Sequence, residues 1–459
     1  MKIAILGNGS IGLMTALKLS NDGHKIVLFG DKNKVGSASK ASGAMLNVMA
    51  EMEKDQFELN SSKQKFYLAY NSQRKWNDFI KKNFSPNEFK SFKKRSTFIF
   101  TNNFTTPFEN KQFEYLKKQA NIFPKDIELK NKALKKLKFD SNFSDLIYLP
   151  REKYIDSRLL LSKLDQLIIK NKVKTIFDKK IYKLKKRNQK ILIKYKNKTQ
   201  LFDYVIVALG SYSQKFIENN KKLVGNIPKI FFGAGTAFRI KKKKFTPKFK
   251  KNNQVLRTMN RGNACGFHLI PLSNDEYYFG ASNSISQIEE KKSRIGSVSV
   301  LTNGLINEFN ENLKDNHLEL CVGHRPTSAD TYPILGPLNK HPQIIFATGT
   351  KRDGVTSCLE ISDLIKNYIN GDKTSFEKYK LFKPNRKLLS FFSEEIAINK
   401  AAEASVAGYV MHNGKKHLND WNKLVKLEKN RIKKIYKKLA VKNFGIHPEL
   451  ISLYDNKRI

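Results

Sequence analysis

Arg325 is the residue whose surroundings point most directly to chemistry. It lies in Gly323-His324-Arg325-Pro326, where a glycine and a proline restrict and shape the backbone on either side. An arginine fixed in this way presents a planar fork that suits the two oxygens of a carboxylate. The alternative is a structural ion pair with Asp330. The segment therefore predicts a carboxylate-binding arginine or a buried ion pair.

A second chemical feature stands at the start of the chain, where GNGSIG follows the apolar run Ile3–Leu6 and precedes a helical pattern. Its first glycine allows a sharp turn, its second lets a pyrophosphate approach bare backbone, and its third lets the helix pack on the strand. The helix N-terminus offers N–H groups and a positive dipole end to phosphates. Dinucleotide binding is favoured over a glycine-rich turn without a ligand. The residues assigned to this site are Gly7, Gly9, Ser10, Ile11 and Gly12.

An acid follows the second strand pattern, Lys25–Phe29, at a distance typical of a residue that binds ribose hydroxyls. The usual position for that acid is occupied by Gly30, and Asp31 comes one residue later. A solvated aspartate in a turn is the alternative interpretation.

Two further segments have the composition of cofactor-binding loops. Residues 36–46 are mostly small, so backbone N–H groups and hydroxyls could approach a ligand closely; a flexible linker is the alternative. Residues 344–369 show the same order of elements as the start of the chain: a strand, a glycine-rich turn and a helix. We expect the N-terminus of that helix to point at an anionic or electron-rich group.

The elements that must position these residues alternate between helix and strand. Strand patterns precede both glycine-rich turns, and antiparallel strands are expected between residues 228 and 285, which indicates an α/β protein. The remaining patterns predict helices over 62–82, 157–169 (capped by Asp156) and 356–369, strands over 97–100, 174–177, 191–193 and 204–209, and a helical tail after residue 380.

Composition limits the class of protein. A chain of 459 residues with 40% hydrophobic residues can bury two or three structural units. The net charge of +45 comes mostly from lysines spread along the chain, which indicates compositional bias more than a nucleic-acid site, where arginines and aromatics gather on one face. The densest run, Lys241–Lys251, is expected to be an exposed loop.

Membrane, metal and secretion signals are not predicted. No apolar run approaches the length of a spanning helix, and the first strand begins at Lys2, so a cytoplasmic protein is expected. The three cysteines, Cys265, Cys321 and Cys358, form neither a disulfide framework nor a zinc pattern.

Over roughly residues 1–375 the chain resembles the FAD-dependent D-amino acid oxidase superfamily, and within it glycine oxidase and sarcosine oxidase-type amine oxidoreductases. The matching segments occur in the same order: GNGSIG, SASKASGAML, VIVALGSYS, and GHRPTSADTYPILG with ATGTKRDGV. The resemblance implies a discontinuous Rossmann-like FAD domain (1–90, 150–215 and 322–375), an antiparallel-sheet substrate domain (91–149 and 216–321) and a helical Lys-rich C-terminal extension (380–459).

The resemblance also implies roles for individual residues. Arg325 matches the arginine that pairs with the substrate carboxylate, Arg352 matches a position near flavin and substrate, and His268 stands where a substrate-facing tyrosine occurs, unless it is only a core histidine. Cys321 lies near the position of covalent attachment but two residues early, so non-covalent FAD is favoured. The remaining residues implied to bind FAD are Asp31, Lys32, Ser39, Ser42, Gly43, Ala44, Met45, Ala208, Gly210, Gly349, Lys351, Asp353, Gly354 and Val355.

The implied reaction is oxidation of the C–N bond of a small amino acid or N-substituted glycine. Hydride would pass to flavin N5, the imine would hydrolyse to an oxo acid, and oxygen or another acceptor would take the electrons. Two alternatives stay open: a flavin-dependent enzyme acting on a carboxymethylamino-bearing tRNA base, with RNA held by the basic tail, and a flavoprotein subunit whose tail docks a partner. Oligomeric state is not predicted.

Overall fold

The computed structural model describes residues 1–129, 143–178, 182–195, 198–241, 254–262, 265–273, 275–413, 415–439 and 442–455. It contains a mainly parallel sheet in the order β17-β18-β10-β1-β2-β6, which is six-stranded within these residues. Among the described strands of this sheet, β17 alone is antiparallel. The strands are β1 (Lys2–Leu6), β2 (Lys25–Gly30), β6 (Lys174–Phe177), β10 (Tyr204–Val207), β17 (Ile334–Pro337) and β18 (Ile344–Thr348).

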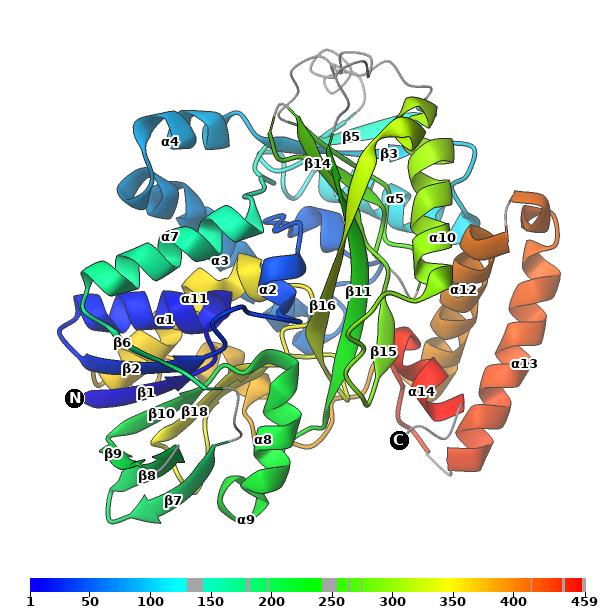
Figure 1. Ribbon diagram of the computed structural model, residues 1–459. Helices are drawn as coiled ribbons and strands as arrows, with labels where there is room; N and C mark the ends of the chain where they lie inside the picture. The colour runs from blue at the N-terminus through cyan, green and yellow to red at the C-terminus, as the bar shows by residue number, and fades with distance from the viewer. Residues whose placement is uncertain are drawn as a thin grey trace.

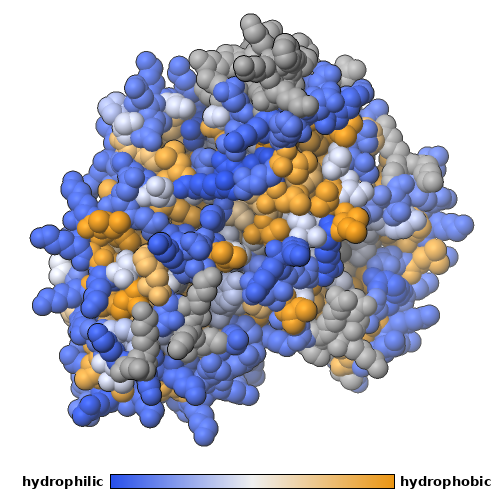
Figure 2. Space-filling model, in the orientation of Figure 1, coloured by the Kyte–Doolittle hydropathy of each residue, from blue (hydrophilic) through white to orange (hydrophobic). Residues whose placement is uncertain are grey.

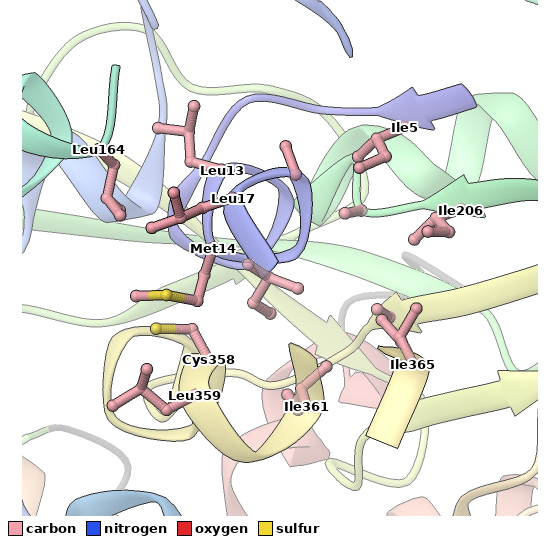
Figure 3. Close-up of a cluster of buried hydrophobic side chains, with 14 of the residues drawn as sticks. Ile5, Leu13, Met14, Leu17, Leu164, Ile206, Cys358, Leu359, Ile361 and Ile365 are labelled. Atoms are coloured by element: carbon pink, nitrogen blue, oxygen red, sulfur yellow. The ribbon is translucent and has the colours of Figure 1, made fainter. Parts of the chain in front are cut away.

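Helices α1 (Ser10–Asn21) and α11 (Gly354–Ile369) pack against each other on this sheet. Figure 3 shows Met14 of α1 pointing toward Cys358 of α11, with Ile5 and Ile206 supplied by neighbouring strands. Fully burying such a side chain contributes about 1.5–3 kcal/mol. Because both helices start at the carboxyl ends of parallel strands, this packing brings both glycine-rich turns to one edge of the sheet.

A second, larger sheet has the order β15-β11-β14-β13-β12-β3-β5-β4, with β16 paired to β11 along its length. It is mainly antiparallel, as expected for 228–285, although β12 pairs in parallel with β3. The predicted domain boundary at residue 322 falls inside β16. The strands are β3 (Ser96–Thr101), β4 (Glu128–Leu129), β5 (Asp145–Leu149), β11 (Ile230–Lys241), β12 (Gln254–Arg257), β13 (His268–Pro271), β14 (Glu276–Gly280), β15 (Ser284–Ser286) and β16 (His317–Ser328).

Smaller elements complete the chain up to residue 380. The three-stranded sheet is β7 (Lys183–Arg187), β8 (Lys190–Tyr195) and β9 (Lys198–Phe202). The loop predicted over 36–46 contains one helical turn, α2 (Ala38–Ala41), and Asp156 caps α7 as predicted. The other helices are α3 (Asn60–Asn83), α4 (Pro86–Lys93), α5 (Pro107–Gln119), α7 (Ser157–Lys170), α8 (Ser213–Asn219), α9 (Lys221–Val224) and α10 (Ile295–Gly304).

The C-terminal extension is helical, with α12 (Glu394–Asn413), α13 (Trp421–Leu439) and α14 (Ile451–Asp455). It lies beside the larger sheet, on the side away from the parallel sheet (Figure 1). Ile398, Ile432 and Ile451 of the extension form one apolar cluster with Phe231 of β11 and Ile285 of β15. The extension is therefore part of the folded body.

The small residues of α12 allow close approach to the rest of the chain. Ala397, Ala401, Ala404 and Ala407 are buried, and a Cβ added to Gly262 would lie 1.9 Å from the carbonyl oxygen of Ala404. Glycine at 262 is required both by this contact and by its φ of +56°.

The surface agrees with a chain rich in lysine. Hydrophilic side chains cover most of the face in Figure 2, and apolar side chains form smaller areas between them. No helix among the described residues is both long and apolar enough to cross a membrane. The loop predicted at Lys241–Lys251 lies, after Lys241, outside the described residues.

Gly262→Ala should destabilise the protein by about 2 kcal/mol or more, because the new methyl group meets backbone and the residue keeps a left-handed φ. Gly408→Ala in α12 is the matched control, since its Cβ would meet nothing within 4 Å. Alanine is favoured there by up to about 1 kcal/mol. Thermal unfolding measures both; equal midpoints for the two variants would contradict this packing of α12.

Candidate active site

A cavity of about 450 Å³ opens where the two sheets meet. Its wall contains residues of both glycine-rich turns and of the small-residue loop (residues 36–46). The three predicted catalytic residues, Arg325, Arg352 and His268, also line it. Three of the residues predicted to bind the cofactor, Gly12, Lys32 and Gly349, do not line it. Lys32 is exposed to solvent, whereas Gly12 and Gly349 serve the packing and the turn that support the wall.

The first and third glycines of GNGSIG are required by the protein itself. A Cβ on Gly7, where φ is +110°, would lie 2.1 Å from the Ala208 carbonyl oxygen. A Cβ on Gly12 would lie 1.8 Å from the carbonyl oxygen of Gly7. The backbone of this turn therefore packs directly against the residue that follows β10 and against the first turn of α1, and a side chain at either position would not fit.

Gly9 is different, because the nearest atom to an added Cβ is Ser39 Oγ at 3.2 Å. Gly9 is the N-cap of α1 and supplies no side-chain acceptor to the helix. Ser10 N donates to Ser39 Oγ at 3.1 Å, which ties the small-residue loop to this turn. Bare backbone at the positive end of a helix, on a cavity wall, fits a diphosphate.

Asn8 explains why the acid after β2 is displaced by one residue. Its Nδ2 donates to the Asp31 carbonyl at 2.8 Å, and its Oδ1 accepts from Asp31 N at 3.2 Å. A Cβ on Gly30 would lie 2.2 Å from Asn8 Cγ, so that position must be glycine. The Asp31 carboxylate accepts hydrogen bonds from Asn33 N and Val35 N and lines the cavity.

Arg325 projects from β16 across the face of β11. A Cβ on Gly235 would lie 2.4 Å from Arg325 Nη1, so the missing side chain of Gly235 makes room for the guanidinium. Nη1 donates to the Ser282 carbonyl at 3.0 Å and to Asn283 Oδ1 at 3.3 Å, both neutral acceptors. The alternative pairing with Asp330 is wrong, because Asp330 accepts from Arg386 Nη2 at 2.9 Å.

Arg352 lies on the same cavity wall but has acidic partners. Nη2 donates to Glu449 Oε1 at 3.0 Å, and Nε lies 3.7 Å from Glu51 Oε2. Lys351 Nζ lies 2.8 Å from the same Glu449 oxygen. Burial disfavours the charge on Glu449, but Lys351 and Arg352 hold its pKa well below the usual range.

Sequence reasoning missed both carboxylates. Glu449 lies 97 residues after Arg352, in a tail whose composition indicates only a basic helical segment. Glu51 follows the small-residue loop with no motif around it. Burial opposes its ionisation, yet the charges of Arg257 and Arg352 lower its pKa to about 2. The sequence contains no motif around Glu51 or Glu449 that would have indicated either residue.

His268 is buried on β13, and its ring stacks on Tyr278 at 5.8 Å between centroids. Nδ1 lies 3.0 Å from the Gly266 carbonyl oxygen, which can only accept, so the proton is on Nδ1. Burial, and then the charge of Arg257, lower the pKa of His268 to about 3. A neutral imidazole with an unprotonated Nε2 therefore lines the cavity.

Metal-binding clusters and disulfides were the other possibilities for these side chains. The part of the chain that the structure describes holds no group of three or more His, Cys, Asp or Glu side chains arranged to bind a metal ion. Cys265, Cys321 and Cys358 are all buried and free. Cys321 does not line the cavity; its Sγ lies 3.7 Å from Arg158 Nη2.

Comparison with known proteins identifies the class. Residues 2–367 match the model of the FAD dependent oxidoreductase family. The chain belongs to this family of enzymes, and FAD is its cofactor; the C-terminal extension lies beyond the matched residues. Among curated proteins, none matches the sequence.

Solved structures share the fold at low sequence identity. Glycine oxidase from Geobacillus kaustophilus is 15% identical, with a TM-score of 0.68 over 84% of this chain and 99% of that one. Iminodiacetate oxidase from Chelativorans sp. BNC1 is 14% identical, with 0.66 over 80% and 95%. L-alpha-glycerophosphate oxidase from Mycoplasma pneumoniae, solved with FAD bound, is 17% identical, with 0.61 over 80% and 94%.

Gly9→Ala should weaken FAD binding by about 10-fold or more, because its methyl group fills the phosphate cradle without meeting backbone. The apoprotein should lose only the stability that alanine costs at an N-cap, about 1 kcal/mol or less. Fluorescence titration of apoprotein with FAD measures the affinity. Gly296→Ala, whose Cβ would meet nothing within 4 Å, is the control. Unchanged FAD affinity in Gly9→Ala would place the diphosphate elsewhere.

Proposed function

We propose that this enzyme oxidises the C–N bond of a small amino acid or N-substituted glycine that carries its carboxylate on Arg325. The observation behind the proposal is the difference between the two arginines on the cavity wall. Arg352 has Glu449 and Glu51 as partners, whereas the partners of Arg325 are a carbonyl and an amide oxygen. Arg325 can therefore take a carboxylate without displacing an ion pair.

Arg325 would orient the substrate by two parallel hydrogen bonds to its carboxylate. This holds the α-carbon at a fixed position relative to the cavity wall, and positioning supplies a large share of the rate for a reaction that needs little acid–base help. Bound FAD supplies the two-electron acceptor: the substrate loses its α C–H bond and one N–H proton and becomes an imine. Water then converts the imine to an oxo acid and an amine.

The amine must lose its ammonium proton before this oxidation. His268 is neutral, and its unprotonated Nε2 on the cavity wall is a suitable hydrogen-bond acceptor for the substrate nitrogen. With a pKa of about 3, His268 would hold this N–H group in place and would not keep the proton. We assign it a positioning role.

The cofactor is proposed to be held without a covalent bond. Cys321 lies off the cavity wall, next to Arg158. His324 lines the cavity, but its ring nitrogens lie 3.1 and 2.8 Å from the carbonyl oxygens of Gly36 and Glu290. The names of two similar structures, glycine oxidase and iminodiacetate oxidase, support a carboxylated amine as substrate. The name of a third, glycerophosphate oxidase, indicates a phosphate ester as the alternative substrate to test.

Arg325→Met should lower kcat/KM for sarcosine by about 100-fold or more, since the carboxylate loses its charged partner. It should change the rate with sarcosine methyl ester, which has no carboxylate, much less. Anaerobic reduction of the flavin, followed across glycine, sarcosine, proline, D-amino acids and glycerol 3-phosphate, measures both the substrate class and this effect.

Arg158→Met is the matched control, because Arg158 is a partly exposed arginine that pairs with Glu319 away from the cavity. It should keep full activity. If kcat/KM for sarcosine is unchanged in Arg325→Met, Arg325 does not bind the substrate. If glycerol 3-phosphate alone reduces the flavin, the substrate is a phosphate ester and not an amine.

A further inference from the structure

The C-terminal extension reaches the cavity through one buried carboxylate. After α13 the chain returns toward the site: Phe391 N donates to the Gly445 carbonyl at 2.8 Å, and Ile446 N donates to Tyr436 Oη at 2.7 Å. The ring of His447 packs on Phe391 at 4.6 Å, and Glu449 N donates to His447 Nδ1 at 3.2 Å. This backbone places Glu449 under the cavity wall.

Glu449 contacts both cations of the second glycine-rich turn. Oε1 lies 2.8 Å from Lys351 Nζ and 3.0 Å from Arg352 Nη2, and the side chains of Glu449 and Lys351 are only 2% and 3% exposed. At such burial the attraction between opposite charges is weakly screened. The fork of Arg352 is therefore engaged by the protein before any ligand arrives.

The same carboxylate is connected to Arg325. Its Oε2 accepts from Asn283 Nδ2 at 3.0 Å, and Asn283 Oδ1 accepts from Arg325 Nη1 at 3.3 Å. The chain of contacts thus runs Arg352–Glu449–Asn283–Arg325. Glu449 neutralises one arginine directly, but reaches the other only through a neutral amide, which leaves the positive charge of Arg325 to a ligand.

We propose that Glu449 is a specificity-determining residue that restricts the site to amines with a single carboxylate. This inference rests on the proposed function above. With Glu449 in place, a second carboxylate on the substrate would have to compete with a buried ion pair for Arg352. Without it, Nη2 of Arg352 loses its charged acceptor, although Glu51 still lies 3.7 Å from Nε. A dicarboxylate then gains a charged donor on the same wall that a monocarboxylate cannot use.

Sarcosine and iminodiacetate test this directly, because the second carries one more carboxylate on an otherwise similar N-substituted glycine. We expect the wild-type enzyme to prefer sarcosine in kcat/KM. Glu449→Gln should shift the ratio toward iminodiacetate by about 10-fold or more, whereas Glu449→Asp, which keeps the charge, should preserve most of the preference.

Removing one partner of a buried ion pair costs stability, so Glu449→Gln needs a companion. The double variant K351M/E449Q removes one cation together with the carboxylate and keeps the net charge of the trio. It should show the same shift toward iminodiacetate. Glu403→Gln is the control, since Glu403 belongs to the same extension and pairs with Lys111 at the surface.

Calorimetric titration with acetate and malonate provides a readout that does not depend on turnover. Malonate should bind Glu449→Gln and the double variant about 10-fold more tightly than the wild type, and acetate should not. Suppose that sarcosine reduces the flavin, but that both variants keep the wild-type preference for sarcosine over iminodiacetate and the wild-type affinity for malonate relative to acetate. Glu449 then does not set specificity. If no amine reduces the flavin, the proposed function fails, and the titration still decides the role of Glu449.

Discussion

The buried ion pair of Glu449 with Lys351 and Arg352 is the interaction on which this site depends. Three cations, Lys351, Arg352 and Arg325, lie on the wall of one cavity, and like charges so close together oppose one another. Two carboxylates relieve this repulsion: Glu51, beside Arg352, and Glu449, which the C-terminal extension supplies to both Lys351 and Arg352. Because Glu449 pairs with two of the three cations, we propose that it also determines which arginine receives a ligand.

This dependence explains the way the extension is built. A carboxylate can be delivered to a buried site only by a segment that is itself anchored, and α12 and α13 provide the anchor by packing on β11 and β15. The small side chains of α12 let its backbone reach Gly262. Arg386, at the start of the extension, pairs with Asp330 next to β16. The extension thus contacts the sheet that carries Arg325 and, through Glu449, the turn that carries Arg352.

The parts of the fold that could be predicted are those controlled by local sequence. The apolar run before GNGSIG, and the glycines that backbone contacts demand at positions 7 and 12, specify β1 and α1 without help from distant residues. Arg325 could be singled out because its neighbours in sequence shape its backbone. The similarity of the segments around it to a known family then indicated FAD, which the family match confirms.

The parts that could not be predicted depend on contacts between distant residues. Asp31 occupied an unusual position because Asn8 crosses the end of β2, which only the folded structure reveals. Asp330 was a reasonable partner for Arg325 by proximity in sequence, but Arg386 takes it. Glu51 and Glu449 carried no motif, and both were found only when the chain brought them to Arg352.

We propose that a substrate carboxylate binds Arg325 while Glu449 remains paired with Arg352. A crystal structure of the FAD-bound enzyme with methoxyacetate, in which oxygen replaces the nitrogen of sarcosine and blocks oxidation, tests it most directly. We predict the methoxyacetate carboxylate on the Arg325 guanidinium, with the Glu449 ion pairs intact. A carboxylate bound to Arg352, with Glu449 displaced, would contradict both roles.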